Sequence, residues 1–477
     1  MASSSPRRLI VLELNEAPLR VLRERAQVAP GGALARVLRE GRAWVTVTRD
    51  SGHLSPWTTW STVHRGVGVE VHGVRDQGQD LRSLDRAHPA LWRLALEAGR
   101  SVGVGGSLGS APLPADARRF AFHLPDTFAE DERAHPRHLA RFQELNLALV
   151  DASSRNVGTG LPLGPALRAL VAAPRLGWGP RVLGAVAAQL VAERIQPWRR
   201  IRRRSLQAVL GFAAFRAELR RTRPDHAAFF TNHLASSLHR YWPARWPEDY
   251  ASLDLGDAWR RRYQHEVDAA LDLADRQLAA LLVEAGRAPG TVVLVVSSMG
   301  QAAMDEGEVR HRQLHLADPG RLFRTLGLDD SAWEPLRAMA PRFVFRIEEE
   351  WREPLRRSLD GFQVQGAPLD WEEHEGGVFR ILLGHRNLTD AGVRVELGGR
   401  RVKLREVGME NLEVEDRSGA YAYHVPQGTL LAWGPGTRDA HWDGGEEPVD
   451  TRALAPAMLE LLGVPVPGSM TVRGLAL

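Results

Sequence analysis

The chain has 477 residues, 44% of them hydrophobic, so it is long enough to bury a large core in one elaborated domain or in two to three modules. It contains no cysteine, which excludes disulfides, thiolate metal ligands and a cysteine nucleophile. The net charge is only +4, and almost all cations are arginines, with Lys403 as the only lysine. No apolar run reaches the roughly 20 residues of a membrane span or forms a secretory signal, so we expect a cytoplasmic protein with no transmembrane segment.

Segments typical of strands and helices alternate along much of the chain. Strands are predicted at 9–14, 43–48, 101–105, 226–231, 291–296 and 429–433. Helices are predicted at 91–97, 257–285 and 451–462. The run TVVLVV at 291–296 is continuously apolar and β-branched, which is typical of a strand buried on both faces of a parallel sheet. The alternation predicts a three-layer α/β/α sandwich around a mostly parallel central sheet.

Two stretches interrupt this pattern and are predicted to be insertions. Residues 125–222 form an arginine-rich helical insertion, expected to act as a cap, and residues 301–420 form a mixed insertion with a small β module around the turn LGGRR. The α/β core is then assembled from 1–124, 223–300 and 421–477. We expect both insertions to lie over the carboxyl edge of the strands, where such folds keep their sites.

Two blocks of sequence carry a resemblance to a known family. Residues 55–74 read SPWTTWSTVHRGVGVEVHGV, and residues 449–475 read VDTRALAPAMLELLGVPVPGSMTVRGL. They resemble the nucleophile helix and the closing helix of the alkaline phosphatase superfamily, in its phosphodiesterase and nucleotide pyrophosphatase branch. The resemblance implies phosphoester chemistry that uses two divalent cations and a Thr or Ser nucleophile at a helix start.

Most positions that bind metal in that family hold a different residue here. They correspond to Asn15, Ser298, Met299, Ala235, His239 and His424. The resemblance thus leaves two imidazoles and none of the three carboxylates. Two cations roughly 4 Å apart would repel each other strongly without those negative charges. We therefore predict against a binuclear centre and for one divalent ion, zinc or manganese, on His239 and His424.

The third ligand of such an ion has two candidates. Glu16 follows the changed first-strand position, and His233 precedes the changed position at Ala235 by two residues. Each also has a structural explanation, because Glu16 can be a solvated residue near a helix start and His233 can be a hydrogen-bonded core histidine. The same alternative holds for His239 and His424, which can be packing residues inherited from the family.

The nucleophile position falls on Ser55 if the alignment with the family shifts by one residue. Ser55 is followed by Pro56, and Ser at the N-cap with Pro in the first turn is also what a helix start requires. A helix N-terminus is in addition a seat for an oxyanion or phosphate. Asn15 has an amide N–H that could donate to an oxyanion directly, so Ser55, Asn15 and Glu16 are the candidate catalytic residues.

The densest arginine cluster lies at 194–223 and has three interpretations. It lines the mouth of the site for an anionic substrate, with Arg199, Arg200 and Arg203 as candidate contacts. In the second interpretation the cluster binds an acidic surface, and in the third it is an ordinary solvated face.

These features together predict a hydrolase or transferase acting on a phosphate or related anionic ester, with a remodelled metal centre. The substrate would be a small molecule or a glycan or lipid ester, and no motif indicates nucleic-acid binding. The alternative is a catalytically inactive member of the superfamily that binds an anionic glycan, lipid head group or nucleotide. A shared fold by itself does not decide between these functions.

Overall fold

The computed structural model describes residues 8–75, 79–151, 162–304, 309–336, 338, 341–385, 388 and 392–477. The chain forms two compact units. The first comprises Met1–Asn146, Gly164–Gly307 and Ala420–Leu477, and the second comprises Leu147–Leu163 and Glu308–Gly419. Within the described ranges, no helix has both the length and the apolar character needed to cross a bilayer.

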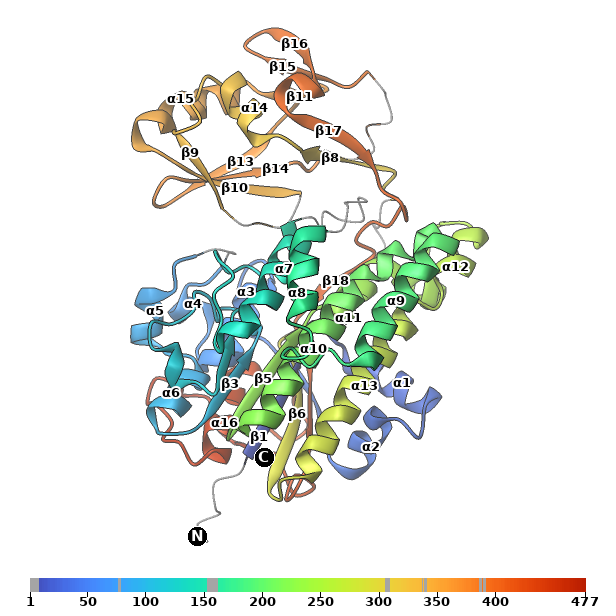
Figure 1. Cartoon of the computed structure of the whole chain (residues 1–477), viewed down its shortest axis with the longest axis vertical. Coiled ribbons are helices and arrows are strands. Elements are labelled where there is room, and N and C mark those ends of the chain that lie inside the picture. The colour runs from blue at the N-terminus through green and yellow to red at the C-terminus, as the bar shows by residue number, and fades with distance from the viewer. Residues whose placement is uncertain are drawn as a thin grey trace. The chain divides into compact units, whose positions relative to one another are not determined.

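The first unit is built on an eight-stranded sheet (Figure 1). In spatial order its strands are β21 (Val449–Asp450), β2 (Arg42–Val47), β19 (Gln427–Trp433), β6 (Thr291–Ser297), β1 (Arg8–Leu14), β5 (His226–Thr231), β3 (Val102–Gly105) and β4 (Phe122–Leu124). Neighbouring strands are parallel except that β19 runs antiparallel to β2 and β6. The predicted mostly parallel sheet is confirmed, and β1 and β6 are adjacent parallel strands as their apolar sequences indicated.

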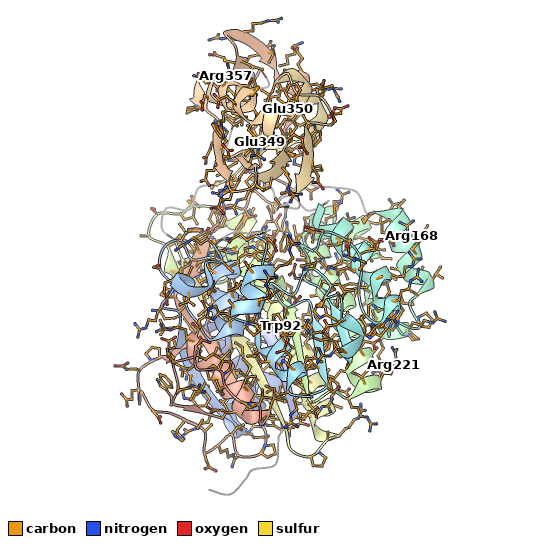
Figure 2. The ribbon with its side chains drawn as sticks, turned by 90° about the vertical axis from the view of Figure 1, so that its left-hand side faces the viewer. Trp92, Arg168, Arg221, Glu349, Glu350 and Arg357 are labelled. Atoms are coloured by element: carbon orange, nitrogen blue, oxygen red, sulfur yellow. The ribbon has the colours of Figure 1, made fainter. Side chains whose placement is uncertain are left out.

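Helices cover both faces of this sheet, which gives the three predicted layers (Figure 1). On one face lie α3 (Pro56–Arg65), α6 (Leu91–Glu97) and α16 (Leu454–Leu461), whose side chains share a core with Leu9 and Val11 of β1. Trp92 belongs to this core and is labelled in Figure 2. Because side chains alternate along a strand, Ile10 and Leu12 are buried on the opposite face. The helices that pack there are α2 (Ala33–Glu40), α10 (Arg203–Thr222) and α13 (Glu266–Gly286).

Further helices and short strands lie wholly or largely in the first unit. They are α1 (Leu19–Val28), α4 (Val69–His72), α5 (Arg82–Ala87), α7 (Ala140–Asp151), α8 (Leu163–Val171), α9 (Pro180–Ile195), α11 (His233–Arg245), α12 (Asp257–Tyr263), β20 (His441–Trp442) and β22 (Leu475–Ala476). The single helix expected over 257–285 is two helices, α12 and α13. The break places Tyr263 against Tyr241, with ring centroids 5.2 Å apart, and starts α13 at the buried Glu266.

One helix of the segment 125–222 has a different role from the expected cap. The aromatic rings of Phe212 and Phe215 in α10 contact Phe229 of β5, with centroids 5.3 Å and 5.1 Å apart. α10 therefore covers a face of the sheet instead of its carboxyl edge. Its apolar residues are buried by the strands, which explains why this arginine-rich helix is also rich in phenylalanine and alanine.

The second unit contains small antiparallel sheets around its own core. Its elements are β8 (Arg312–Leu316), α14 (Pro319–Thr325), β9 (Trp333–Leu336), β10 (Arg342–Ile347), α15 (Glu349–Asp360), β11 (Gln363–Val364), β12 (Ala367–Pro368), β13 (Asp370–His374), β14 (Val378–Leu382), β15 (Arg394–Leu397), β16 (Arg400–Lys403) and β17 (Met409–Glu413). The predicted LGGRR turn joins β15 to β16. Gly398 and Gly399 have φ of 54° and 77°, the left-handed conformation that a two-residue hairpin loop requires.

Buried histidines make the first unit sensitive to acid. His226 begins β5 and is only 1% exposed. Burial lowers the pKa of His226 from 6.5 to about 4, because a charged imidazole would lose its hydration inside the core. A group whose pKa is lower in the folded state contributes stability above its unfolded pKa. That contribution is lost as the pH falls from 6.5 towards 4.

We expect His226→Gln to flatten the pH dependence of stability. In the wild type, this one residue lowers the free energy of unfolding by about 2 kcal/mol between about pH 7 and pH 5. Urea denaturation of both proteins at the two pH values measures the difference. His265→Gln is the matched control, because the His265 side chain is 75% exposed and its loss should leave the slope unchanged. An unaltered slope in His226→Gln would show that His226 does not carry the effect.

Candidate metal centre

Three side chains far apart in the sequence meet at the carboxyl end of β1. Glu16 follows β1, His239 lies in α11, and His424 lies on β18 (Ala422–Val425). β18 pairs antiparallel with β7 (Gly300–Ala303), which follows β6 and places Gln301 directly opposite His424. One oxygen or nitrogen from each of Glu16, His239 and His424 lies within 4.8 Å of the other two. All of these residues belong to the first unit.

Three side chains of the centre converge on one carboxylate oxygen. Nε2 of His239 lies 2.9 Å from Oε2 of Glu16, and Nε2 of His424 lies 3.3 Å from the same atom. The side-chain amide of Gln301 also donates to this oxygen. The second oxygen, Oε1, accepts a hydrogen bond of 2.9 Å from Nδ2 of Asn15. Glu16 is buried, so this ring of donors replaces the water that would otherwise solvate its charge.

The outer nitrogen of each imidazole fixes the orientation of the ring. Nδ1 of His239 donates to the carbonyl of Ala422 at 2.6 Å, and Nδ1 of His424 donates to the carbonyl of Leu54 at 2.7 Å. A carbonyl only accepts, so the proton of each neutral ring is on Nδ1 and the lone pair is on Nε2. Each Nε2 then meets Glu16 either with a second proton or with a cation between them. Histidines that bind metals show this arrangement, with the outer N–H on a carbonyl.

The electrostatics of the cluster favour a charged carboxylate among the imidazoles. Burial raises the pKa of Glu16, but the charges and hydrogen bonds of His424 and His239 outweigh burial and hold this pKa far below its usual range. Burial lowers the pKa of His424, but Glu16 and the carbonyl of Leu54 reverse the direction, and the pKa is raised. The pocket therefore attracts positive charge, whether as protons or as a metal ion.

The backbone of Glu16 is strained, which is frequent at functional sites. Its φ is 54°, in the left-handed region that costs a residue with a β-carbon on the order of 1 kcal/mol. Neighbouring contacts hold this conformation. The backbone N–H of Asn15 donates to the carbonyl of Thr231 at 3.1 Å, and the backbone N–H of Ala17 donates to Oγ of Ser297 at 2.8 Å.

The donor set fits a single transition-metal ion. One carboxylate oxygen and two imidazole nitrogens are ligands that suit a zinc or manganese ion. Three protein ligands also leave a coordination position for water or substrate, which is typical of catalytic sites. Of the two candidates for the third ligand, Glu16 is the one that lies in the cluster.

His233, the other candidate, lies outside the cluster. Its Nδ1 is 2.8 Å from Oγ1 of Thr231, and its Nε2 is 3.0 Å from the carbonyl of Ala270. Burial lowers the pKa of His233 to about 4, so the ring is neutral and donates from Nε2 to the carbonyl. With both nitrogens used by the protein, His233 is a core histidine, and the prediction that it is a ligand is corrected.

Asn15 positions Glu16 and is not free to donate to a substrate oxyanion. Its Nδ2 donates to Oε1 of Glu16 and to Oδ1 of Asn232 at 2.8 Å, which uses both amide hydrogens. Its Oδ1 accepts from the indole of Trp60 at 2.8 Å. These bonds correct the predicted catalytic role.

Ser298 and Met299, which follow β6, make contacts inside the first unit. Ser298 and Met299 are both fully buried, and Oγ of Ser298 lies 2.8 Å from Oγ1 of Thr59 in α3. A hydroxyl pair and a thioether occupy these two positions. Neither offers the negative charge that a second cation would need.

Ser55 forms the N-cap of α3, as its sequence indicated. Its Oγ accepts from the amide of Trp57 at 3.4 Å, and Pro56 occupies the first helical turn. The preceding carbonyl, that of Leu54, is the one bound by His424, so the start of α3 is fixed to the cluster. The ring of His53 adjoins the same place, 6.4 Å from the ring of His424.

The three arginines predicted to contact substrate lie in or next to a 3-10 turn before α10. Arg203 pairs with the buried Glu193 at 2.7 Å, and the guanidinium of Arg199 lies over the ring of Trp198 at 5.4 Å. Arg200 is exposed. These contacts hold Arg199 and Arg203 to other parts of the helical segment, which argues against the predicted role at the mouth of the site.

Buried carboxylates are the partners of several arginines of this cluster. Glu284 in α13 accepts from Arg216, Arg220 and Arg287, each within 2.9 Å. Arg202 pairs with Glu266 at 2.6 Å, and both acids are nearly inaccessible to solvent. The arginines therefore attach α10 and its preceding turn to α13, a role that none of the three earlier interpretations included.

Two residues of the centre carried no usable signal in the sequence. Gln301 follows the changed central-strand motif and shares a ladder position with His424, but its partner Glu16 lies 285 residues earlier. Trp60 donates to Asn15 from within the helix of the first motif. A polar residue in a short strand next to a motif is the only feature that could have indicated Gln301.

The comparisons with known proteins gave matches only among solved structures. No family model matches the sequence, and no curated protein matches it. Murine ectonucleotide pyrophosphatase/phosphodiesterase 5 is similar at 11% identity, over 97% of this chain and 96% of that chain, with a TM-score of 0.40. An inactive variant of that protein in complex with AMP gives a TM-score of 0.41 at the same identity and coverage. TAB5 alkaline phosphatase, in a mutant with magnesium bound, is 10% identical over 97% of this chain and 99% of that chain, with a TM-score of 0.36.

We expect Asn15→Asp to destabilise the protein in the absence of metal. The new carboxylate would face Oε1 of Glu16 at the present 2.9 Å, so a donor becomes a like charge in a buried place. The free energy of unfolding should fall by about 3 kcal/mol. Thermal unfolding in a chelator measures the loss.

Asn232→Asp is the matched control for this change. Position 232 is exposed and uses its Oδ1 only as an acceptor from Asn15, so Asp preserves the bond. Its melting temperature should stay close to that of the wild type. Equal melting temperatures for both variants would contradict the role given to Asn15.

Proposed function

We propose that this chain is a hydrolase or transferase of phosphate or related anionic esters that works with one divalent cation. The cation would be held by Glu16, His239 and His424. The observation that carries the proposal is the convergence of two Nε2 atoms on one buried carboxylate oxygen, with both outer nitrogens fixed on carbonyls. A purely structural ion pair would need only one of these histidines.

When bound, the cation would polarise an ester oxygen as a Lewis acid. The chain's own residues supply the rest of the chemistry. The N-terminus of α3 presents the positive end of a helix to an anionic oxygen, and its position is fixed through Leu54 and His424. In this proposal an anionic ester binds between the cluster and Ser55.

Ser55 is the proposed nucleophile because its hydroxyl stands at that helix start. As the cap it accepts from the amide of Trp57, which leaves its own proton available for transfer. His53, whose ring lies next to that of His424, is the proposed acceptor of this proton. Gln301 and Asn15 would orient Glu16 without touching the substrate.

The first test is the metal content. After exposure to zinc or manganese and dialysis, elemental analysis should find about one ion per chain. His239→Ala, His424→Ala and Glu16→Gln should each weaken binding by more than about a hundredfold, because partners one step further from a metal already cost ten- to hundredfold. Titration calorimetry with the same metal salt gives the affinities.

His265→Ala is the control for a general loss of surface imidazole, since that side chain is 75% exposed. It should bind metal like the wild type. Two ions per chain, or full metal binding by His239→Ala and His424→Ala, would contradict the single centre.

The second test separates chemistry from folding at Ser55. Glycine is nearly as good an N-cap as serine, so Ser55→Gly should change stability by only a few tenths of a kcal/mol. Its turnover of p-nitrophenyl phosphate or bis-p-nitrophenyl phosphate should nevertheless fall by roughly a thousandfold or more, because the nucleophile is absent. Metal binding should be unchanged.

Ser55→Thr keeps a hydroxyl at the same place and should retain part of the activity. If Ser55→Gly turns over within a few-fold of the wild type, Ser55 is a cap and not the nucleophile. If the wild type binds metal but hydrolyses no ester of a broad panel, the centre serves a protein that binds an anionic ligand without converting it.

A further inference from the structure

Helix α8 presents its apolar side chains to solvent. Leu167, Leu170 and Val171 are 64%, 50% and 86% exposed. Their spacing of three and four residues places them on one face of the helix. Ala169, on the other side, is fully buried. A surface helix normally turns its apolar face to the core, so the arrangement in α8 is inverted. Such an exposed apolar face marks a surface that binds something.

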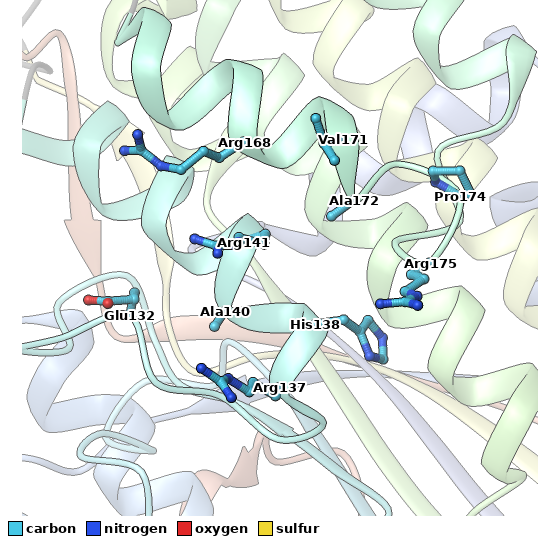
Figure 3. Close-up of a pocket in the computed structure, with 10 residues that line it drawn as sticks. All are labelled: Glu132, Arg137, His138, Ala140, Arg141, Arg168, Val171, Ala172, Pro174 and Arg175. Carbon is cyan, nitrogen blue, oxygen red and sulfur yellow. The ribbon is translucent and has the colours of Figure 1, made fainter.

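A cleft of about 670 Å³ lies beside this helix, and its lining includes four arginines and one carboxylate, that of Glu132 (Figure 3). Its arginines come from both sides, with Arg137 and Arg141 on the segment that begins α7, and Arg168 and Arg175 on and after α8. Val171 belongs both to the exposed apolar face and to the lining of the cleft. Figure 2 shows Arg168 at the surface of the molecule. Apolar and cationic side chains therefore form one continuous surface.

The arginines of the cleft exceed the acids near them. Arg141 and Arg168 share one carboxylate, that of Glu144, at 3.3 Å and 2.5 Å. In the parts of the chain that the structure describes, no carboxylate forms an ion pair with Arg137 or Arg175. This contrasts with the arginines of α10, whose partners are buried glutamates. The cleft thus keeps cationic groups for a partner outside the chain.

We propose that α8 and the adjoining arginine cleft attach the protein to the surface of an anionic lipid bilayer. Leu167, Leu170 and Val171 would enter the boundary between head groups and acyl chains, and the arginines would bind lipid phosphates. A helix with an apolar face and flanking cations lies in the plane of a membrane and does not span it. Anionic lipids attract such cations electrostatically.

Charge complementarity favours a membrane over a second copy of this chain. In a two-fold dimer through this face, each copy would place its arginines near those of the other, since the same patch meets itself. Like charges brought together at an interface repel each other and disfavour the complex. A bilayer of anionic lipid offers the opposite charge and an apolar interior at the same depth.

The test is co-sedimentation of the full chain with vesicles. Vesicles of phosphatidylcholine with phosphatidylserine should bind the protein, and vesicles of phosphatidylcholine alone should not. The paired changes Arg137→Gln with Arg175→Gln should lower the partition coefficient by roughly tenfold or more, since two surface cations are lost. Leu167→Gln with Leu170→Gln should lower it similarly, and this loss should persist at high salt, where the arginines are screened.

Matched controls remove the same groups from other exposed places. Val28→Gln with Val283→Gln removes two exposed valines, and Arg394→Gln with Arg400→Gln removes two exposed arginines. Both should bind phosphatidylserine vesicles like the wild type, and thermal unfolding checks that all variants fold. If the leucine pair variant of α8 and the arginine pair variant of the cleft both bind the vesicles like the wild type, the proposal is wrong. Equal binding to both kinds of vesicle, or a dimer in solution that the leucine changes dissociate, would also overturn it.

Discussion

A single buried carboxylate, that of Glu16, holds together the candidate site of this protein. Taking a carboxylate out of water is costly unless donors replace the lost hydration. Here the polar partners come from four separate segments, with Asn15 beside it, His239 on α11, Gln301 on β7 and His424 on β18. His424 in turn fixes Leu54 and the start of α3. One buried charge thus positions the end of β1, the helices α3 and α11, and the paired strands β7 and β18.

The layered fold could be predicted from the sequence because its signal is local. Five consecutive apolar residues in β6 and the alternation of strands and helices are enough to indicate a covered parallel sheet. The role of α10 could not be predicted, because helical periodicity does not say which surface a helix covers. The division between α12 and α13 was also hidden, since both halves have helical composition and only the packing of Tyr263 separates them.

The candidate site could be predicted in part, through residues that keep the spacing of a motif. His239 and His424 were found in this way, and Glu16 was one of two alternatives. Sequence could not decide between Glu16 and His233, because the decision rests on which side chain points into the cluster and which points to Ala270. The role of Asn15 was missed for the same reason, as its partners Trp60 and Asn232 lie 45 and 217 residues away. The arginine cluster was judged by the acids near it in sequence, while Glu266 and Glu284 follow 64 residues or more later.

The pairing of β7 with β18 marks a point at which a segment can be inserted into the first unit. Ala303 at the end of β7 lies opposite Ala422 at the start of β18, so the chain leaves the first unit and re-enters it at two neighbouring points. The segment Glu308–Gly419 of the second unit lies between these two points in the sequence, and the pairing of β7 with β18 holds the points together. Such a junction accepts an insert of any length or shape whose ends lie close together. The segment Glu308–Gly419 is therefore placed where a different module, or a plain hairpin loop, would leave the pairing of the same two alanines intact.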